Sequence, residues 1–168
     1  DLSVQKMPTV IEGSKSSGQL RKDVARQWGI EGNPIVAGGG GDNASSACGL
    51  GVVNTGDAFI SLGTSGVIFL VSDKYLPAAN DGAHSFCHAI PNKWHLMSVI
   101  LSATDSLNWL SEITGKEVSK MMENMNDDNA EPSNLMFHPY LSGERTPHND
   151  ASAKASFLNI TRSSSIND

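Results

Sequence analysis

A run of four consecutive glycines, Gly38, Gly39, Gly40 and Gly41, most constrains what this chain can fold into. The run follows a short apolar segment, residues 34–37, and it ends at Asp42. Glycine loses more conformational freedom on folding than any other residue, so such a run is costly unless the backbone must closely approach another element or a ligand. Aspartate is also a favoured helix N-cap. The pattern alone is therefore compatible with a capped helix and with Asp42 as a functional side chain.

The composition is that of a globular protein with one ordinary domain or parts of two. Of the 168 residues, 39% are apolar and 18% are charged, and the net charge of -6 argues against nucleic acid or an anionic membrane as the main partner. No apolar run is long enough to span a membrane, and no signal peptide opens the chain. Because Cys48 and Cys87 are too few for a disulfide framework, we predict buried thiols and a cytoplasmic protein.

The first third of the chain predicts an α/β arrangement. Apolar residues recur every four positions between Leu20 and Trp28, which predicts an amphipathic helix over residues 16–28 that ends at Gly29. Residues 34–37 then predict a short buried strand. After the glycine run, a second helix is expected to begin with Asp42 as its N-cap, and its small residues favour close packing.

The remainder predicts a sheet followed by helices. Residues 58–62 and 67–71 alternate in the manner of strands and predict a β-hairpin, and residues 85–90 and 94–101 predict two further strands. Consecutive hairpins would join these four strands into a meander. Helices are predicted over residues 103–114, ended by Gly115, and 118–125, ended by Asn126. Further strands are expected in residues 135–141, interrupted at Pro139, and 157–160.

The turn of the first hairpin consists of Gly63, Thr64, Ser65 and Gly66 and is called the 63–66 turn below. Glycine is common in hairpin turns because it adopts positive φ without steric cost. The alternative is a phosphate loop, since successive backbone N–H groups form an anion nest to which two hydroxyl groups add donors. No lysine follows at the spacing of a Walker A loop.

Other polar residues give weaker indications. The chain has five histidines. His84 and His88 are four residues apart, but they fall on a predicted strand with no acid between them, so we predict no metal ligands among the histidines. Glu144 and Arg145 lie in a polar loop, where they could form a weak surface ion pair or the arginine could hold a phosphate or join two domains. We favour a structural role for this pair.

Five stretches, in the same order and at similar spacing, resemble the FGGY family of carbohydrate kinases. They are Val36-Ala37-Gly38-Gly39-Gly40-Gly41-Asp42-Asn43-Ala44, Ser61-Leu62-Gly63-Thr64-Ser65-Gly66-Val67, His84-Ser85-Phe86-Cys87-His88-Ala89, Trp94-His95-Leu96-Met97-Ser98-Val99 and Tyr140-Leu141-Ser142-Gly143-Glu144-Arg145-Thr146-Pro147-His148. The family usually has three glycines before the aspartate, so Gly41 is a departure from its pattern.

The resemblance implies two actin-like, ribonuclease H-like domains with an active site between them. Residues 1–52 would be the C-terminal part of the first, sugar-binding domain, and residues 53–168 the N-terminal part of the second, nucleotide-binding domain. The implied activity of the full-length enzyme is ATP-dependent phosphorylation of D-xylulose with Mg²⁺, and a homodimer remains open. The alternatives are another pentulose or polyol as substrate, or an actin-like nucleotide-binding module without sugar kinase activity.

The resemblance also assigns site residues by position. Asp42 matches the catalytic base, which also contacts the sugar, and Asn43 matches a second sugar contact. The 63–66 turn matches a phosphate loop, while Thr104 and Asn108 match nucleotide contacts more loosely. The chain begins without methionine and lacks the sugar loop, a first phosphate hairpin and the adenine site. We therefore expect an excised fragment that is inactive by itself.

Overall fold

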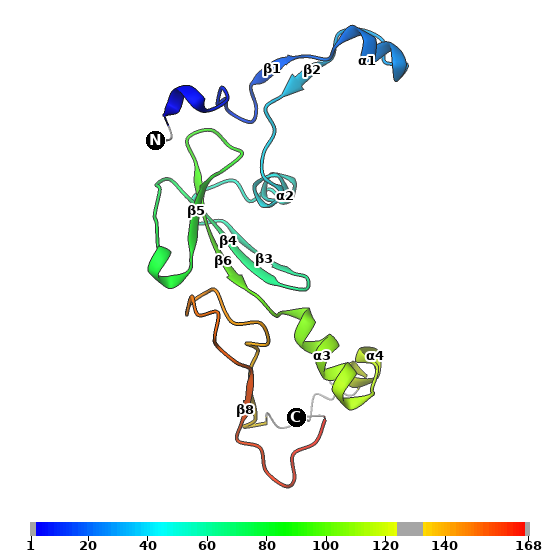
Figure 1. The fold of residues 1–168 in the computed structure, drawn as a ribbon, viewed down its shortest axis with the longest axis vertical. Coiled ribbons are helices and arrows are strands. Elements are labelled where there is room, and N and C mark those ends of the chain that lie inside the picture. Colours follow the sequence, from blue (N-terminus) through cyan, green and yellow to red (C-terminus); the bar gives the residue numbers. More distant parts are fainter. Residues whose placement is uncertain (1–2, 124–132, 167–168) are drawn as a thin grey trace. The chain divides into compact units, whose positions relative to one another are not determined.

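The computed structural model describes residues 3–123 and 133–166 (Figure 1). The chain divides into two compact units. The first unit comprises Asp1–Phe59, Leu70–Leu76 and Ser85–Leu96, and the second comprises Ile60–Phe69, Pro77–His84 and Met97–Asp168. No helix in the described part of the chain is both long enough and apolar enough to span a membrane.

The first unit begins with a short 3-10 helix, η1 (Val4–Lys6), and a two-stranded antiparallel sheet. Strand β1 (Ser16–Gln19) pairs with β2 (Ile35–Ala37), and α1 (Lys22–Gln27) lies between them in sequence. The helix predicted over residues 16–28 is therefore wrong in its first part. Serine and glycine have low helix propensity, and the hydroxyl of Ser17 instead donates to the carbonyl oxygen of Val36 at 2.9 Å.

The end of α1 and the presence of β2 agree with the sequence, but the burial of β2 does not. Gly29, with φ of +66°, follows α1 and donates its N–H to the carbonyl oxygen of Arg26. Ile35 and Val36 are 69% and 42% exposed, so the prediction of a buried strand is wrong. The physical reason is that β2 belongs to a sheet of two strands, which offers too little structure to cover both faces.

Helix α2 (Asp42–Leu50) follows the glycine run and ends at Gly51, which has a left-handed conformation with φ of +75°. Its N-cap is Gly41, with φ of −61° and ψ of 153°, and no side chain caps the helix. The prediction of Asp42 as N-cap is therefore wrong, because the extended residue is the additional glycine and Asp42 is already helical. Ala44 and Ala47 are buried, as the small-residue pattern predicts.

A four-stranded sheet contains β3 (Ala58–Leu62), β4 (Gly66–Ser72), β5 (His84–Cys87) and β6 (Trp94–Ile100). All four predicted strands are present, but their order is β3-β4-β6-β5 rather than that of a simple meander. The long connection after β4, which includes the 3-10 helix η2 (Ala79–Asp81), allows β6 to take the place beside β4 and leaves β5 at the edge. Cys87 lies on this edge strand and is exposed, and Cys48 is half-buried, so the prediction of two buried thiols is wrong.

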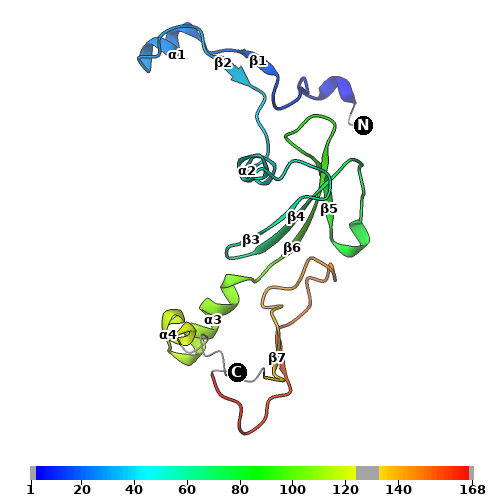
Figure 2. The same ribbon diagram turned by 180° about the vertical axis from the view of Figure 1, so that it is seen from behind.

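The second unit contains the remaining elements. Strand β6 leads into α3 (Thr104–Thr114), which ends at Gly115 and is followed by α4 (Val118–Met122) (Figure 2). The predicted end of this last helix, Met125 and Asn126, lies outside the described residues. Strands β7 (Met136–His138) and β8 (Ser156–Leu158) pair antiparallel, and an aromatic cluster links them to α3. In this cluster, the ring of Trp109 stacks on Phe137 and Phe157 at centroid distances of 5.8 and 6.3 Å.

Candidate active site

The first two residues of the glycine run pack against the chain that precedes them. A Cβ atom added to Gly38 would lie 2.8 Å from the carbonyl oxygen of Glu12, which leaves no room for a side chain. Gly39 has φ of +82°, a conformation that strains other residues, and its N–H donates to the carbonyl oxygen of Gly13 at 3.0 Å. Backbone packing therefore accounts for Gly38, and the left-handed backbone conformation accounts for Gly39.

The last two glycines differ from each other. A Cβ atom on Gly40 would lie 3.1 Å from the Ser45 hydroxyl oxygen and 3.2 Å from the Cβ atom of Ala89, so the absence of a side chain here permits close packing. Gly41 has no atom within 4 Å of an added Cβ, and its φ of −61° suits any residue. Neither packing nor conformation requires glycine at position 41, immediately before Asp42.

Asp42 is the first residue of α2 and is exposed. Its Oδ1 atom accepts the backbone N–H of Asn43 at 2.8 Å and the side-chain amide of the same residue at 3.3 Å. No other hydrogen bond or ion pair to this carboxylate is formed within residues 3–123 and 133–166. The structure thus brings Asp42 and Asn43 together and leaves Oδ2 able to accept a proton or a hydrogen bond from a ligand.

The 63–66 turn belongs to the second unit, and the carbonyl groups of Gly63, Thr64 and Ser65 are all engaged. The Gly63 oxygen accepts the N–H and the hydroxyl of Thr104 at 3.0 and 2.7 Å. The Thr64 oxygen accepts the N–H of Ala103 at 2.9 Å, and the Ser65 oxygen accepts the N–H of Gly63 at 3.0 Å. The N-terminal amides of α3 therefore hold the turn by its acceptors.

The donors of the same turn remain available. Thr64 and Ser65 are exposed, and neither their backbone N–H groups nor their hydroxyls form a hydrogen bond in the described part of the chain. Neither Gly63 nor Gly66 has a positive φ, so the usual reason for glycine in a hairpin turn does not apply. An added Cβ on Gly66 would meet Ala103 at 3.3 Å, whereas one on Gly63 would meet nothing closer than the Ser65 oxygen at 3.7 Å. A turn with satisfied acceptors and free donors is suited to an anion.

The two nucleotide contacts predicted from α3 lie on one face of that helix. Thr104 and Asn108 are four residues apart, which places them one turn apart. The Thr104 hydroxyl is used in the bond to Gly63, so this residue positions the turn whatever else it contacts. Asn108 is exposed and forms no hydrogen bond within the described residues. Their contact with a nucleotide stays a prediction.

Glu144 has a structural role that the sequence only partly indicates. It is 3% exposed, and its Oε1 atom accepts the backbone N–H groups of Leu101 at 3.1 Å and Arg145 at 2.7 Å. Within the described chain no ion pair joins it to Arg145, so the interpretation as a surface ion pair is wrong. Instead, the buried carboxylate of Glu144 satisfies the amides at the end of β6 and in its own loop, so Glu144 has a structural role, while the role of the Arg145 side chain stays a prediction. Among the described residues, no group of three or more histidine, cysteine, aspartate or glutamate side chains is placed to hold a metal ion.

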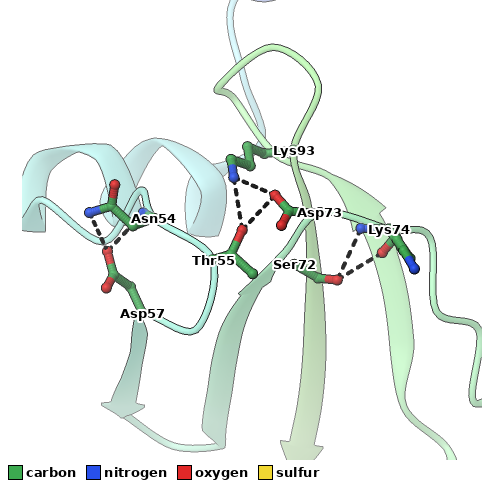
Figure 3. Close-up of polar contacts among 7 residues, drawn as sticks. All are labelled: Asn54, Thr55, Asp57, Ser72, Asp73, Lys74 and Lys93. Atoms are coloured by element: carbon green, nitrogen blue, oxygen red, sulfur yellow. Dashed lines mark hydrogen bonds and ion pairs between the residues drawn. The ribbon is translucent and has the colours of Figure 1, made fainter.

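A polar network beside β4 was not found from the sequence (Figure 3). Lys93 donates to the Thr55 hydroxyl at 2.8 Å and forms an ion pair with Asp73, and Thr55 donates to the same Asp73 oxygen at 2.6 Å. The hydrogen bond from Lys93 lowers the pKa of Asp73 below its ordinary value. Nearby, the backbone N–H of Asn54 donates to the carboxylate of Asp57 and lowers its pKa. Thr55, Asp73 and Lys93 are far apart in sequence, and no local pattern marks their association.

Comparisons with known proteins agree with this structure. Residues 58–168 match the model of the FGGY family of carbohydrate kinases, C-terminal domain. The xylulose kinase of Escherichia coli K12 is 49% identical over 164 residues, which cover 96% of this chain and 33% of that protein. The xylulose kinase of Klebsiella pneumoniae is 46% identical, again over 96% of this chain and 33% of its own length. This chain thus spans about a third of the length of the curated relatives it matches.

Solved structures show the same relationship. The crystal structure of a xyloylose kinase from Brucella ovis superposes with a TM-score of 0.91 at 45% identity, over 96% of this chain and 34% of that one. A gluconate kinase from Lactobacillus acidophilus superposes with a TM-score of 0.80 at 25% identity, over 95% of this chain and 33% of that one. The predicted actin-like, ribonuclease H-like fold class is confirmed, with this chain as one part of the kinase fold. The chain belongs to the FGGY family of carbohydrate kinases.

Proposed function

We propose that the intact protein transfers the γ-phosphoryl group of ATP to the 5-hydroxyl of D-xylulose. The relatives that cover 96% of this chain at 46–49% identity are xylulose kinases, and this similarity supports the choice of sugar. The observation that carries the proposal is the hydrogen bonding of the 63–66 turn. The backbone N–H groups and the hydroxyls of Thr64 and Ser65 are free to donate, and donors are what a phosphate chain requires.

In this proposal Asp42 is the general base. Its carboxylate accepts the proton of the sugar hydroxyl as that oxygen bonds to the γ-phosphorus and the bond to the β–γ bridging oxygen breaks, which releases ADP. Asn43 supports the role because its amide groups hold Oδ1 of Asp42 and fix the carboxylate, and it is the proposed second contact to the sugar. Phosphoryl transfer through a loose transition state requires mainly such positioning, with the base acting late.

The nucleotide would contact three elements of the second unit. Thr64 and Ser65 would donate to its phosphate oxygens, the absence of a side chain at Gly63 would admit them, and Asn108 and Thr104 would lie along the nucleotide on α3. Mg²⁺ would neutralise charge on the phosphates. Because the described residues hold no cluster of metal-binding side chains, we propose that phosphate oxygens and water supply most of its ligands.

Four further assignments belong to the proposal. Residues 1–52 would complete the first, sugar-binding domain, and residues 53–168 would begin the second, nucleotide-binding domain. The match of residues 58–168 to the family's C-terminal domain supports this boundary. The protein would act in the cytoplasm, and a homodimer is compatible with the proposal. The 168-residue chain alone would not phosphorylate sugar, since it spans only about a third of its relatives.

A different sugar is the second candidate, and the similarity to a gluconate kinase from Lactobacillus acidophilus favours it. The test is a coupled ADP assay on the purified full-length protein with D-xylulose, other pentuloses, polyols and gluconate. We expect the highest kcat/KM with D-xylulose and D-xylulose 5-phosphate as the product. A higher kcat/KM with another sugar would make that sugar the proposed substrate in place of D-xylulose. ATP hydrolysis without sugar dependence would contradict the kinase proposal.

A further inference from the structure

The turn between β5 and β6, residues 88–93, contacts the chain before and after α2. We propose that this turn is a positioning element for Asp42, acting through Ala89 at the N-terminal end of the helix and His88 at its C-terminal end. All of these residues belong to the first unit. The inference rests on the proposed role of Asp42 as base, and it adds residues that nothing in the sequence pattern assigns to the site.

The N-terminal contact lies two residues before Asp42. An added Cβ on Gly40 would lie 3.2 Å from the Cβ atom of Ala89, which is closer than ordinary van der Waals contact, so the backbone of Gly40 rests directly on the turn. On its other side the same position is 3.1 Å from the hydroxyl oxygen of Ser45, in the first turns of α2. Gly40 is thus enclosed between the β5–β6 turn and the helix that Asp42 begins.

The C-terminal contact is made by a buried histidine. His88 is 5% exposed, and its Nδ1 atom accepts the N–H of Ile90 at 3.0 Å. The other ring nitrogen, Nε2, therefore carries the hydrogen and donates to the carbonyl oxygen of Val52 at 3.3 Å. Val52 in turn donates its N–H to the carbonyl oxygen of Ala47 in α2. The imidazole thus connects the turn to the last part of the helix.

Lys93 fixes the far end of the same turn. Its ammonium group bonds to Thr55 and Asp73, so the turn is tied to the segment after α2 and to the end of β4 (Figure 3). A short helix whose two ends contact one anchored turn has little freedom to shift. Since a displacement of about 1 Å can reduce catalysis about a hundredfold, the packing at Gly40 should affect the reaction rate more than substrate binding.

The test uses a compensating pair in the full-length enzyme. Gly40→Ala introduces the crowded methyl group, Ala89→Gly removes its neighbour, and the double variant restores the space on the Ala89 side. Gly49→Ala is the matched control, because it makes the same change within α2 where no atom lies within 4 Å of the added methyl. Each variant is assayed for kcat, for KM of both substrates, for thermal midpoint and for hydrogen exchange of the α2 amides.

We expect Gly40→Ala to lower kcat at least about tenfold with both KM values within about threefold. Ala89→Gly in the same chain should recover part of the lost kcat, because the contact with the Ser45 hydroxyl oxygen at 3.1 Å remains, and Gly49→Ala should leave kcat unchanged. A wild-type kcat in Gly40→Ala, or no recovery in the double variant, would overturn the inference.

The outcome for Asp42→Asn separates the two hypotheses. If that variant is inactive while Gly40→Ala is fully active, only the positioning inference fails. If Asp42→Asn keeps wild-type activity, the proposed function of Asp42 fails. The positioning inference is then decided by hydrogen exchange: faster exchange of the α2 amides in Gly40→Ala, reversed by Ala89→Gly, supports it, and unchanged exchange refutes it.

Discussion

The glycine run, which precedes α2, and the 63–66 turn, which joins β3 to β4, are both glycine-rich, yet their glycines have different causes. In the run, Gly38 and Gly40 are required by close packing and Gly39 by its left-handed backbone. In the turn, neither glycine has a positive φ, and an added Cβ on Gly63 would make only an ordinary contact with the Ser65 oxygen at 3.7 Å. The more conspicuous sequence feature is thus mostly structural, whereas the turn has the free donors.

The difference shows that glycine content is a poor guide to a binding site and that the hydrogen-bond inventory is a better one. In the turn, every carbonyl oxygen from Gly63 to Ser65 has a donor, while the N–H and hydroxyl groups of Thr64 and Ser65 have no acceptor among the described residues. In the run, the proposed functional group is not a glycine but the carboxylate of Asp42 that follows. The two segments therefore fit opposite roles, with the carboxylate accepting from one substrate and the turn donating to the other.

The largest expected effect tests Asp42, the proposed proton acceptor at the end of the glycine run. Asp42→Asn removes the base and keeps the side-chain shape, so kcat of the full-length enzyme should fall by about 10²–10⁴-fold, the range that general base catalysis contributes. Asp23→Asn is the control, because Asp23 lies in the first turn of α1 and pairs only with the exposed Arg21 within the described structure. Steady-state kinetics with saturating sugar and ATP measure kcat of both variants. Near-normal kcat in Asp42→Asn would remove the assigned role.

A smaller effect tests how α3 holds the 63–66 turn, whose free donors are proposed to bind phosphate. Thr104→Val removes the hydroxyl that donates to Gly63 while keeping the side-chain shape, and the loss of one such bond should lower kcat/KM for ATP about tenfold. Thr114→Val makes the same substitution at the other end of α3, where the hydroxyl donates to Leu110 within the helix. We expect Thr114→Val to leave kcat/KM for ATP unchanged. Equal effects of the two variants would show that the Thr104 bond has no special relation to the turn.

The smallest effect is a pH dependence confined to stability. Burial, together with the neighbouring His88, lowers the pKa of His95 to about 4. As the pH falls below about 6.5, this histidine takes up a proton in the unfolded chain but stays neutral in the folded chain. The free energy of unfolding is therefore highest above about pH 6.5 and decreases as the pH falls toward 4, by at most about 3 kcal/mol. Thermal midpoints of wild type and His95→Gln between pH 4 and 8 measure this. A slope between pH 6.5 and 4 that is the same in both proteins would contradict the assignment.

Local patterns predicted most of the elements but not their environment. The hairpin of β3 and β4 and helix α3 follow from alternation and periodicity, which are local signals. The strand order β3-β4-β6-β5 and the exposure of β2 depend on long-range pairing, which no local pattern encodes. The strand at Ser16 was missed because tertiary pairing with Ala37 overrode the apolar spacing.

The candidate site was also only partly predictable, because long-range contacts leave no local signal in the sequence. Resemblance indicated Asp42 and the 63–66 turn, and the free donors of Thr64 and Ser65 appear only once the hydrogen bonds are known. The contribution of Ala89 at Gly40, and of His88 at Val52, depends on residues 36 or more positions apart in sequence. Sequence spacing contains no signal for such contacts.

The most direct test of the account is the response of individual amides to nucleotide. In the full-length protein, selectively labelled with ¹⁵N at glycine, serine and threonine, ADP is titrated without sugar. We predict that the amide resonances of Thr64 and Ser65 shift and saturate, while those of Gly38 and Gly40 do not move. Unchanged Thr64 and Ser65 amides at saturating ADP would contradict the assignment of the phosphate site to the 63–66 turn.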